Sequence, residues 1–254
     1  MNCPTANEFL FAMKRIPYSA EPTSGDVRDL PIYSSAEASF YLDVPKVTIH
    51  NWLRARTFKD KVFQPLVVPA DPVAPTLSYN NLAELHILSV VTRVHKVKMK
   101  DVRRAMDYIK ENYPSSHPLL SREFRTDGHD LFAKIAEGGR LDPETNQIVN
   151  FTRHGQLGLS EILEQYLERV IRDENFLPLK FYPVARGQDK NQKIVCIMPT
   201  VSSGRPIIDE IGIPVSSLWN RFDAGDTIPE LADDYEISED AVRAAIRYVE
   251  ATAA

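Results

Sequence analysis

Apolar residues recur with helical spacing, three or four positions apart, in the first third of the chain, and this pattern predicts two short helices there. Ser34 followed by Glu37 forms a capping box that opens a helix through about residue 42. Asp43 suits a tight turn that needs left-handed backbone, and Pro45 suits the first turn of a second helix. In that second helix Ile49, Trp52 and Leu53 share one apolar face.

The opposite face of this second helix is polar and basic. Lys46, His50 and Arg54 recur four residues apart, with Thr48 and Asn51 beside them. Asn and Arg side chains can read base edges, while Lys and Thr suit phosphates. Two short helices, a tight turn and this stripe indicate a helix-turn-helix.

Further elements are predicted up to residue 113. The segments 63–69 and 76–79 read as a two-stranded wing around a proline-rich turn. One helix is predicted to begin near Asn81 and another to run from about Lys100 to Asn112. The proline-rich segment 113–118 then reads as a linker.

The middle of the chain, residues 119–185, has a mixed pattern. Strands are predicted over 124–135, 147–152 and 177–184, with a turn at 141–146. Ser160 is expected to cap an amphipathic helix that continues to about residue 173. Its apolar stripe suits a core, and a dimer seam is the alternative.

The last sixty residues predict short strands and turns followed by three helices. A helix is expected to pass through Leu218 and Phe222 and to stop at 224–225. Thr227 caps the next helix, and Ser238 caps a last one from Glu239 to about Glu250. The whole pattern favours an α+β fold with an N-terminal winged helix-turn-helix, a mixed middle region and a small helical C-terminal module. The expected divisions are an arm at 1–31, then 32–113, 119–185 and 193–254.

Charge is distributed unevenly along the 254 residues. The net charge is −5, but residues 32–113 hold twelve Lys and Arg against eight Asp and Glu. Residues 209–254 hold eleven acidic and three basic residues, a net of −8. A basic head and an acidic tail suggest two different partners. Ordinary solvated surfaces would give the same averages, so charge alone does not decide.

Composition and motif content argue against several classes of protein. No apolar run is long enough to span a bilayer, and a secretory signal is not expected. Cys3 and Cys196 are the only cysteines, which fits a reducing, cytoplasmic compartment. The six histidines are scattered without zinc-ligand spacing, and no nucleophile elbow or phosphate-binding loop is present. We therefore expect no metal, no cofactor and no catalysis.

The first specific resemblance is carried by EASFYLDVPKVTIHNW at 37–52. It resembles the helix-turn-helix of MerR-like winged-helix proteins, which commonly reads EAAxxLGVxxxTIRxW. The chain departs from that pattern at Asp43, usually Gly, and at His50, usually a basic residue. The resemblance implies a DNA-binding domain, a location in a bacterial cytoplasm and a dimer on a palindromic site.

A second resemblance lies in the tail, where GRPII, GIPV, AG and ELADDY follow one another between 204 and 235. These motifs are similar to an uncharacterised bacterial module usually encoded beside PIN-like ribonuclease toxins. The departure is at 210–212, where the family commonly has Gly-Thr-Arg or Gly-Thr-Gly. With a MerR-like head, the chain resembles VapB-type antitoxins of type II toxin–antitoxin pairs.

The resulting hypothesis is an antitoxin that neutralises a PIN-like toxin and represses its own operon. The expected DNA-binding residues are Lys46, Thr48, His50, Asn51, Arg54, Arg56, Lys59, Lys61, Lys98, Lys100, Arg103 and Arg104. The expected partner-binding residues are Arg205, Trp219, Arg221, Phe222 and Tyr235. The alternative is a MerR-like regulator whose residues 119–185 bind a small effector, with no toxin partner.

Overall fold

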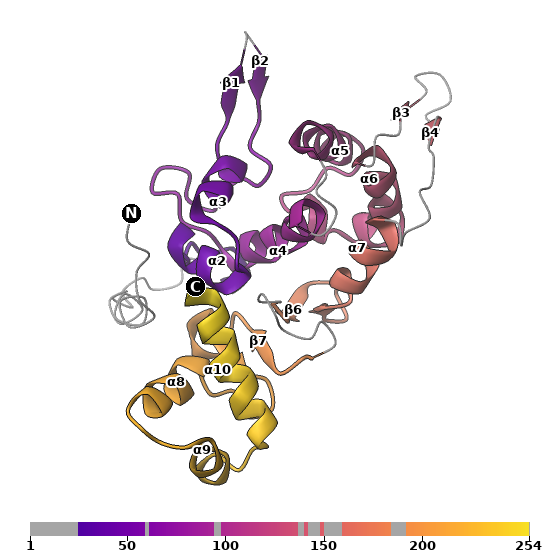
Figure 1. Cartoon of the computed structure of the whole chain (residues 1–254). Helices are drawn as coiled ribbons and strands as arrows, with labels where there is room; N and C mark the ends of the chain where they lie inside the picture. The colour runs from indigo at the N-terminus through magenta and orange to yellow at the C-terminus, as the bar shows by residue number, and fades with distance from the viewer. Residues whose placement is uncertain are drawn as a thin grey trace.

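The computed structural model combines α-helices with small antiparallel sheets, which confirms the predicted α+β class (Figure 1). The residues that it describes are 25–58, 61–93, 98–136, 140–141, 148–149, 159–183 and 192–253. Most of the predicted N-terminal arm therefore lies outside the described residues. The part that is described contains a short 3-10 helix, η1 (Val27–Asp29).

The two short helices of the head form where the sequence predicts them. The Ser34 hydroxyl accepts a hydrogen bond from the Glu37 backbone N–H, and the Glu37 carboxylate accepts from the Ser34 N–H. This capping box starts α2 (Ser35–Leu42), which ends at Asp43 with a left-handed φ of 49°. Pro45 then precedes α3 (Lys46–Leu53).

The hairpin that follows α3 is not where the sequence pattern placed it. Strands β1 (Arg56–Phe58) and β2 (Lys61–Phe63) pair antiparallel and project from the molecule (Figure 1). The prediction of strands at 63–69 and 76–79 was wrong. Phe63 ends β2 and Tyr79 begins α4, and the residues between them form irregular backbone and a turn at 72–75. Single bridges join Asp71 to Thr76 and Tyr33 to Leu77. Their prolines remove the backbone donors that a continuous ladder requires.

Helix α4 (Tyr79–Arg93) runs through the centre of the molecule, and α5 (Met99–Asn112) begins and ends close to its predicted bounds (Figure 1). Every residue from Leu77 to Val90 is buried, including the polar Asn81, Glu84 and His86. A helix buried on all sides is expected to be apolar all round, so these polar residues need internal partners.

The predicted strand at 124–135 is helical instead. A π-helical turn, η3 (Phe124–Gly128), leads into α6 (His129–Ala136) after the 3-10 turn η2 (Pro118–Leu120). Phe124 and Phe132 are fully buried eight residues apart, a spacing that a helix also satisfies. Beyond α6, β3 (Arg140–Leu141) pairs with β4 (Ile148–Val149). The remainder of the predicted turn and of the strand at 147–152 lies outside the described residues.

The amphipathic helix of the middle region is shorter than predicted. Helix α7 (Leu159–Leu167) stops early, and Val170–Arg172 forms the strand β5. With β6 (Pro178–Phe181), β7 (Val195–Ile197) and β8 (Pro206–Ile208), this strand makes an antiparallel sheet in the order β5-β6-β7-β8. The sheet joins strands of the predicted middle region to strands of the predicted tail.

The tail contains the three expected helices, α8 (Val215–Asp223), α9 (Ile228–Asp234) and α10 (Glu239–Ala253). Thr227 and Glu230 form the second capping box of the chain at the start of α9. A 3-10 turn, η4 (Ser202–Gly204), precedes β8. No helix of the described residues has the length and apolarity to cross a membrane.

Head and tail are packed against each other, and α10 ends beside α2 (Figure 1). The Tyr248 hydroxyl of α10 donates to the Tyr41 backbone oxygen at 2.8 Å, and both side chains are fully buried. The Tyr33 hydroxyl donates to the Gly204 backbone oxygen, also at 2.8 Å. Gly204 has a φ of 72°, and a Cβ there would overlap the Tyr33 hydroxyl. This contact explains why the tail motif needs glycine at that position.

Candidate nucleic-acid interface

The solvent-facing side of α3 carries the residues predicted to contact DNA. Ile49, Trp52 and Leu53 are 0%, 1% and 5% exposed, so the opposite side of the helix faces outward. Lys46 and Arg54 are exposed on that side. Thr48, His50 and Asn51, also predicted at the interface, are half-buried.

The turn before α3 is held by several short contacts. The Ser39 hydroxyl donates to the Val44 backbone oxygen at 2.7 Å, and the Val44 N–H donates back to the Ser39 oxygen. Asp43 supplies the left-handed residue that lets the chain reverse in so few residues. The angle between α2 and α3 is therefore fixed by local hydrogen bonds as well as by the apolar core.

His50 lies between two cations on the outer side of α3. Partial burial, together with the charges of Arg54 and Lys46, lowers the pKa of His50 below its ordinary value. At neutral pH the imidazole is consequently uncharged, with one nitrogen able to donate and the other able to accept. The outer side of α3 thus has cations at its two ends and a neutral polar group between them.

Two basic side chains of α5 hold the backbone around α3 and the hairpin. Arg103 Nη1 donates to the Gln64 backbone oxygen at 2.9 Å, and its Nη2 donates to the Asn51 oxygen at 3.3 Å. Lys110 Nζ donates to the Pro65 oxygen at 2.7 Å. These contacts attach the chain that leaves the hairpin to α5, and Arg103 also attaches the C-terminal half of α3 to it. Sequence reasoning missed this role, because a basic residue on an amphipathic helix gives no local sign of a carbonyl partner.

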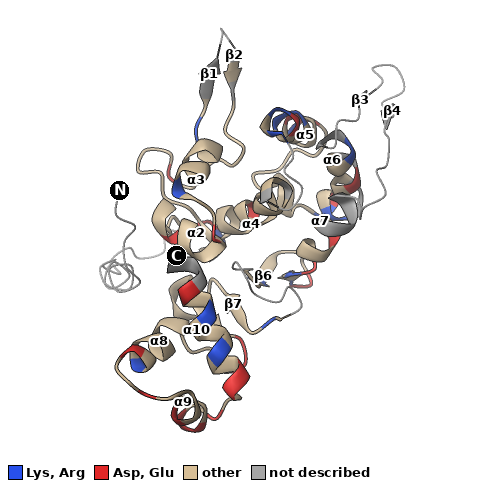
Figure 2. Ribbon diagram, in the orientation of Figure 1, with Lys and Arg blue, Asp and Glu red and all other residues tan. Residues whose placement is uncertain are grey.

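The structure describes the side chains of some of the other predicted cations but not of all. Lys98 and Lys100 are exposed at the start of α5, and Arg104 lies 3.5 Å from Asp101 in an ion pair. The backbones of Arg56 and Lys61 lie in the hairpin, but their side chains and all of Lys59 lie outside the described residues. Figure 2 shows basic residues on α3 and α5, and acidic residues around α9 at the other end of the molecule.

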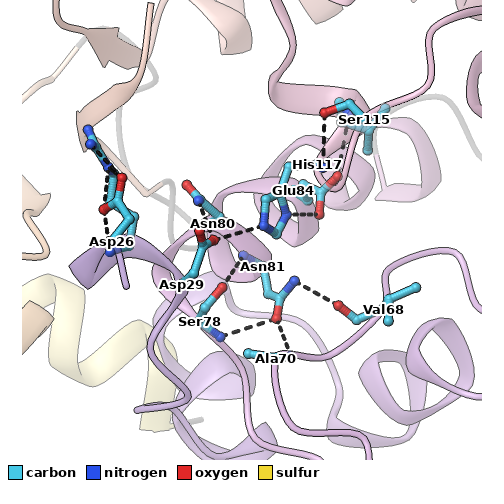
Figure 3. A network of polar contacts seen from close by, with 12 residues as sticks. Asp26, Asp29, Val68, Ala70, Ser78, Asn80, Asn81, Glu84, Ser115 and His117 are labelled. Atoms are coloured by element: carbon cyan, nitrogen blue, oxygen red, sulfur yellow. Dashed lines mark hydrogen bonds and ion pairs between the residues drawn. The ribbon is translucent and has the colours of Figure 1, made fainter. Parts of the chain in front are cut away.

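A network of buried polar side chains supports the head from behind (Figure 3). The Asn81 amide oxygen accepts from the backbone N–H groups of Ala70 and Ser78, and its Nδ2 donates to the Val68 oxygen. A single asparagine of α4 therefore fixes the loop that follows the hairpin. Both of its side-chain polar atoms have partners, which is the condition for a stabilising buried polar group.

His117 ties the linker to the head in the same network (Figure 3). Its Nδ1 lies 3.0 Å from a Glu84 carboxylate oxygen and its Nε2 lies 3.0 Å from an Asp29 oxygen. Burial opposes a charge on the ring, but the two carboxylates outweigh it and the pKa of His117 is raised. Glu84 is 2% exposed, so this imidazole is the charge partner of a buried carboxylate.

The five residues predicted to bind a protein partner lie between the end of η4 and the end of α9 in the tail. The Trp219 and Phe222 rings are 6.1 Å apart on α8 and are partly buried. Arg221 pairs with Asp226 and Asp234, and its guanidinium lies 5.5 Å from the Tyr235 ring centre. Arg205 is half-buried at the end of η4. The structure thus places three of the five on α8 and Tyr235 directly after α9, beside Arg221, with Arg205 apart from them along the chain.

Acidic and histidine side chains do not gather into a metal site in the described parts of the chain, where no three His, Cys, Asp or Glu residues are suitably placed. Cys196 is buried in β7 and donates through its thiol to Asp209 at 3.3 Å. Burial and the Asp209 carboxylate raise the pKa of this thiol to about 12. A thiol that stays protonated at neutral pH is a poor nucleophile.

Comparisons with known proteins extend over nearly the whole chain. Residues 195–249 match a family model described as "Protein of unknown function (DUF433)". The chain is 29% identical over 232 residues to a Mycobacterium tuberculosis protein named "Putative antitoxin VapB45", covering 86% of this chain and 93% of that protein. The fold is similar to the crystal structure of Rv2018 from Mycobacterium tuberculosis, with a TM-score of 0.61 and 27% identity. That match covers 85% of this chain and 98% of the solved chain.

Proposed function

We propose that this chain is the antitoxin of a type II toxin–antitoxin pair, which neutralises a PIN-like ribonuclease toxin and represses its own operon. The observation that carries the proposal is the likeness to a protein named as an antitoxin over 86% of the chain. The match to the tail family covers 195–249, the region whose motifs resemble a module encoded beside such toxins.

The DNA-binding part of the proposal assigns residues 32–113 to a MerR-like winged helix-turn-helix. Helix α3 enters a major groove with the predicted reading residues on its outer side, and the β1–β2 hairpin lies along the backbone as the wing. The exposed cations of α3 and α5 neutralise phosphates, so affinity falls steeply with salt. A homodimer on a palindromic operator matches this arrangement.

The toxin-binding part assigns the acidic tail to a basic surface on the toxin. The carboxylates around α9 attract a ribonuclease whose surface binds RNA phosphates, and the partly buried aromatic residues of α8 supply an apolar anchor. Because the tail and the head share one core cluster, a toxin bound to the tail would be attached to a part of the chain that packs against the DNA-binding residues.

The DNA-binding assignment is tested on the region upstream of the gene. Fluorescence anisotropy compares wild type with the double variant Asn51→Ala plus Arg54→Ala, at several salt concentrations. We expect the double variant to lose about tenfold or more in affinity, since each base contact is worth about 1–3 kcal/mol. Glu239→Ala plus Arg243→Ala on α10 is the matched control, because this exposed pair lies in the tail. Equal affinities of the double variant and wild type would rule out α3 as the reading helix.

Toxin neutralisation is tested by co-expression with the product of the adjacent gene. We expect rescue of growth and recovery of a complex by pull-down. A tail variant, Trp219→Ala plus Phe222→Ala, should lose the complex while retaining operator binding. If wild type neither rescues growth nor retains the neighbouring protein, the antitoxin assignment fails.

A second candidate function, a regulator that responds to a small effector, is favoured by one observation. A cleft of about 590 Å³ opens beside α4 and the linker, with apolar walls from Leu66 and Val67. Its polar lining includes Lys110 together with Asp29, Glu84 and His117. Ligand pockets commonly have this volume and composition. The cleft lies in the head and linker, whereas the sequence pattern favoured residues 119–185 for an effector. Benzoate, an apolar carboxylate, should alter operator affinity in wild type and not in Lys110→Met if this function is correct.

A further inference from the structure

One residue on the outer side of α3 has no role in the fold and was not among the residues predicted to contact DNA. Val47 is 73% exposed. It lies three residues before His50, four before Asn51 and seven before Arg54, so these four residues form a single stripe along α3. Among them, Val47 is the only apolar side chain.

Packing does not explain an apolar residue at this position. The buried face of α3 is formed by Ile49, Trp52 and Leu53, on the other side of the helix axis. Valine also has only moderate helix propensity, so helix formation gives no reason to prefer it at an exposed position. Its isopropyl group therefore stays in water in the free protein, and it is available to a binding partner.

The surroundings of Val47 indicate the chemistry of that partner. Lys46 is its neighbour in sequence, Arg54 lies at the other end of the stripe, and His50 between them is neutral at physiological pH. An apolar patch within a cationic rim suits a surface that is negatively charged at its edges and contains methyl groups at its centre. The major groove of DNA has that character wherever a thymine presents its C5-methyl group between two phosphate backbones.

We propose that Val47 is a specificity-determining residue whose isopropyl group packs against the C5-methyl group of a thymine in each operator half-site. The inference rests on the proposed operator binding by α3 and adds to it the identity of one recognised base. Val47 contributes no charge and no hydrogen bond, so its effect is confined to a position that carries the thymine methyl.

The test removes the methyl group from the DNA and, separately, truncates the isopropyl group of the protein to a methyl group. After the protected segment upstream of the gene is mapped, each thymine in it is replaced singly by uracil, which lacks only the C5-methyl group. Dissociation constants are measured by anisotropy for wild type, Val47→Ala and Val73→Ala. Val73 is 91% exposed in a turn outside α3, so its variant controls for the loss of an exposed valine.

Each half-site should contain one thymine whose single replacement by uracil weakens binding of wild type and of Val73→Ala. We expect the dissociation constant to rise about threefold to fivefold, which corresponds to the free energy of burying one methyl group. Val47→Ala should bind the thymine operator more weakly than wild type and should discriminate thymine from uracil by less than about twofold there. Its melting temperature should equal or slightly exceed that of wild type, because Val47 is not part of the core and alanine has the higher helix propensity.

Two results would overturn the inference while leaving operator binding intact. One is wild-type protein that binds every uracil-substituted operator as tightly as the thymine operator. The other is Val47→Ala that retains the wild-type preference for thymine. Failure of the wild type to bind the upstream region at all would remove both this inference and the DNA-binding part of the proposed function.

Discussion

Asp43 adopts the left-handed conformation that most side chains avoid, and this one residue sets the turn between α2 and α3. Glycine adopts that conformation without the steric cost of a Cβ, whereas alanine bears the full cost. We therefore expect Asp43→Gly to be about 1 kcal/mol more stable to urea unfolding than Asp43→Ala. Both variants lose the same carboxylate, so the comparison isolates the backbone. Equal stability of the two would show that the turn has relaxed to another conformation.

His117 gives the molecule a pH dependence whose sign follows from its two carboxylate partners. Its pKa is raised in the folded protein, so its stabilising contribution is complete below the unfolded value of about 6.5. That contribution is lost as the pH rises through the folded pKa. A glutamine side chain at this position can keep hydrogen bonds but does not titrate. We therefore expect wild type to exceed His117→Gln in stability by about 1–3 kcal/mol at pH 5.5.

The measurement for this prediction is urea unfolding of both proteins between pH 5.5 and 9. The difference in the free energy of unfolding between the two proteins should shrink as the pH increases, because His117 loses its charge. Other titrating groups are the same in both proteins and cancel in the comparison. A difference that is constant over this range, or that grows with pH, would contradict the assigned charge pairing with Glu84 and Asp29.

At the scale of elements, α5 positions α3 and the hairpin through Arg103. Its guanidinium is bonded to two backbone oxygens, so we expect Arg103→Ala to weaken operator binding about threefold to tenfold by loosening that arrangement. A positioning role predicts an unchanged slope of log affinity against log salt. Arg104→Ala, on the exposed side of the same helix, should instead reduce the slope by about 1 if it neutralises a phosphate. A loss of the same size in the slope for Arg103→Ala would make Arg103 a phosphate contact.

Elements whose signals are local could be predicted from the sequence, and elements that depend on distant partners could not. The two capping boxes at Ser34 and Thr227 each lie within four residues, and both helices start where expected. The strand β5 follows the amphipathic helix α7 after a turn of two residues, and its pairing with β6 depends on residues that lie further along the chain. Residues 124–135 were misread because an aromatic-rich apolar segment fits a buried strand and a buried helix alike.

Part of the candidate interface could likewise be predicted from the sequence, and part of it could not. The polar stripe of α3 was predictable, because a helical period of 3.6 separates it from Trp52 and its apolar neighbours. The positions of Arg103 and Lys110 were not predictable, since their partners are backbone oxygens that lie 39 to 52 residues away. The exposure of Val47 was not predicted, and it follows only from the structure, which buries Ile49, Trp52 and Leu53 on the other side of α3.

For the molecule as a whole, the tail is bonded to the head by buried tyrosines whose partners lie 171 and 207 residues away. A core cluster extends from Tyr33 and Ile49 in the head to Leu218 and Val249 in the tail. Contacts of this length and burial couple the stability of one end to that of the other. Head and tail are consequently expected to unfold together, although the sequence presents them as separate modules.

The two tryptophans of the chain make this coupling measurable, since Trp52 lies in the head and Trp219 in the tail. Single-tryptophan proteins, Trp219→Phe and Trp52→Phe, each report on one end by fluorescence. We expect Tyr248→Phe to cost about 1 kcal/mol, because the Tyr41 oxygen loses its buried donor, and to shift the midpoint by the same amount at both reporters. A shift at Trp219 alone would show that the tail unfolds independently, and toxin binding there would then have no rigid connection to the DNA-binding helix.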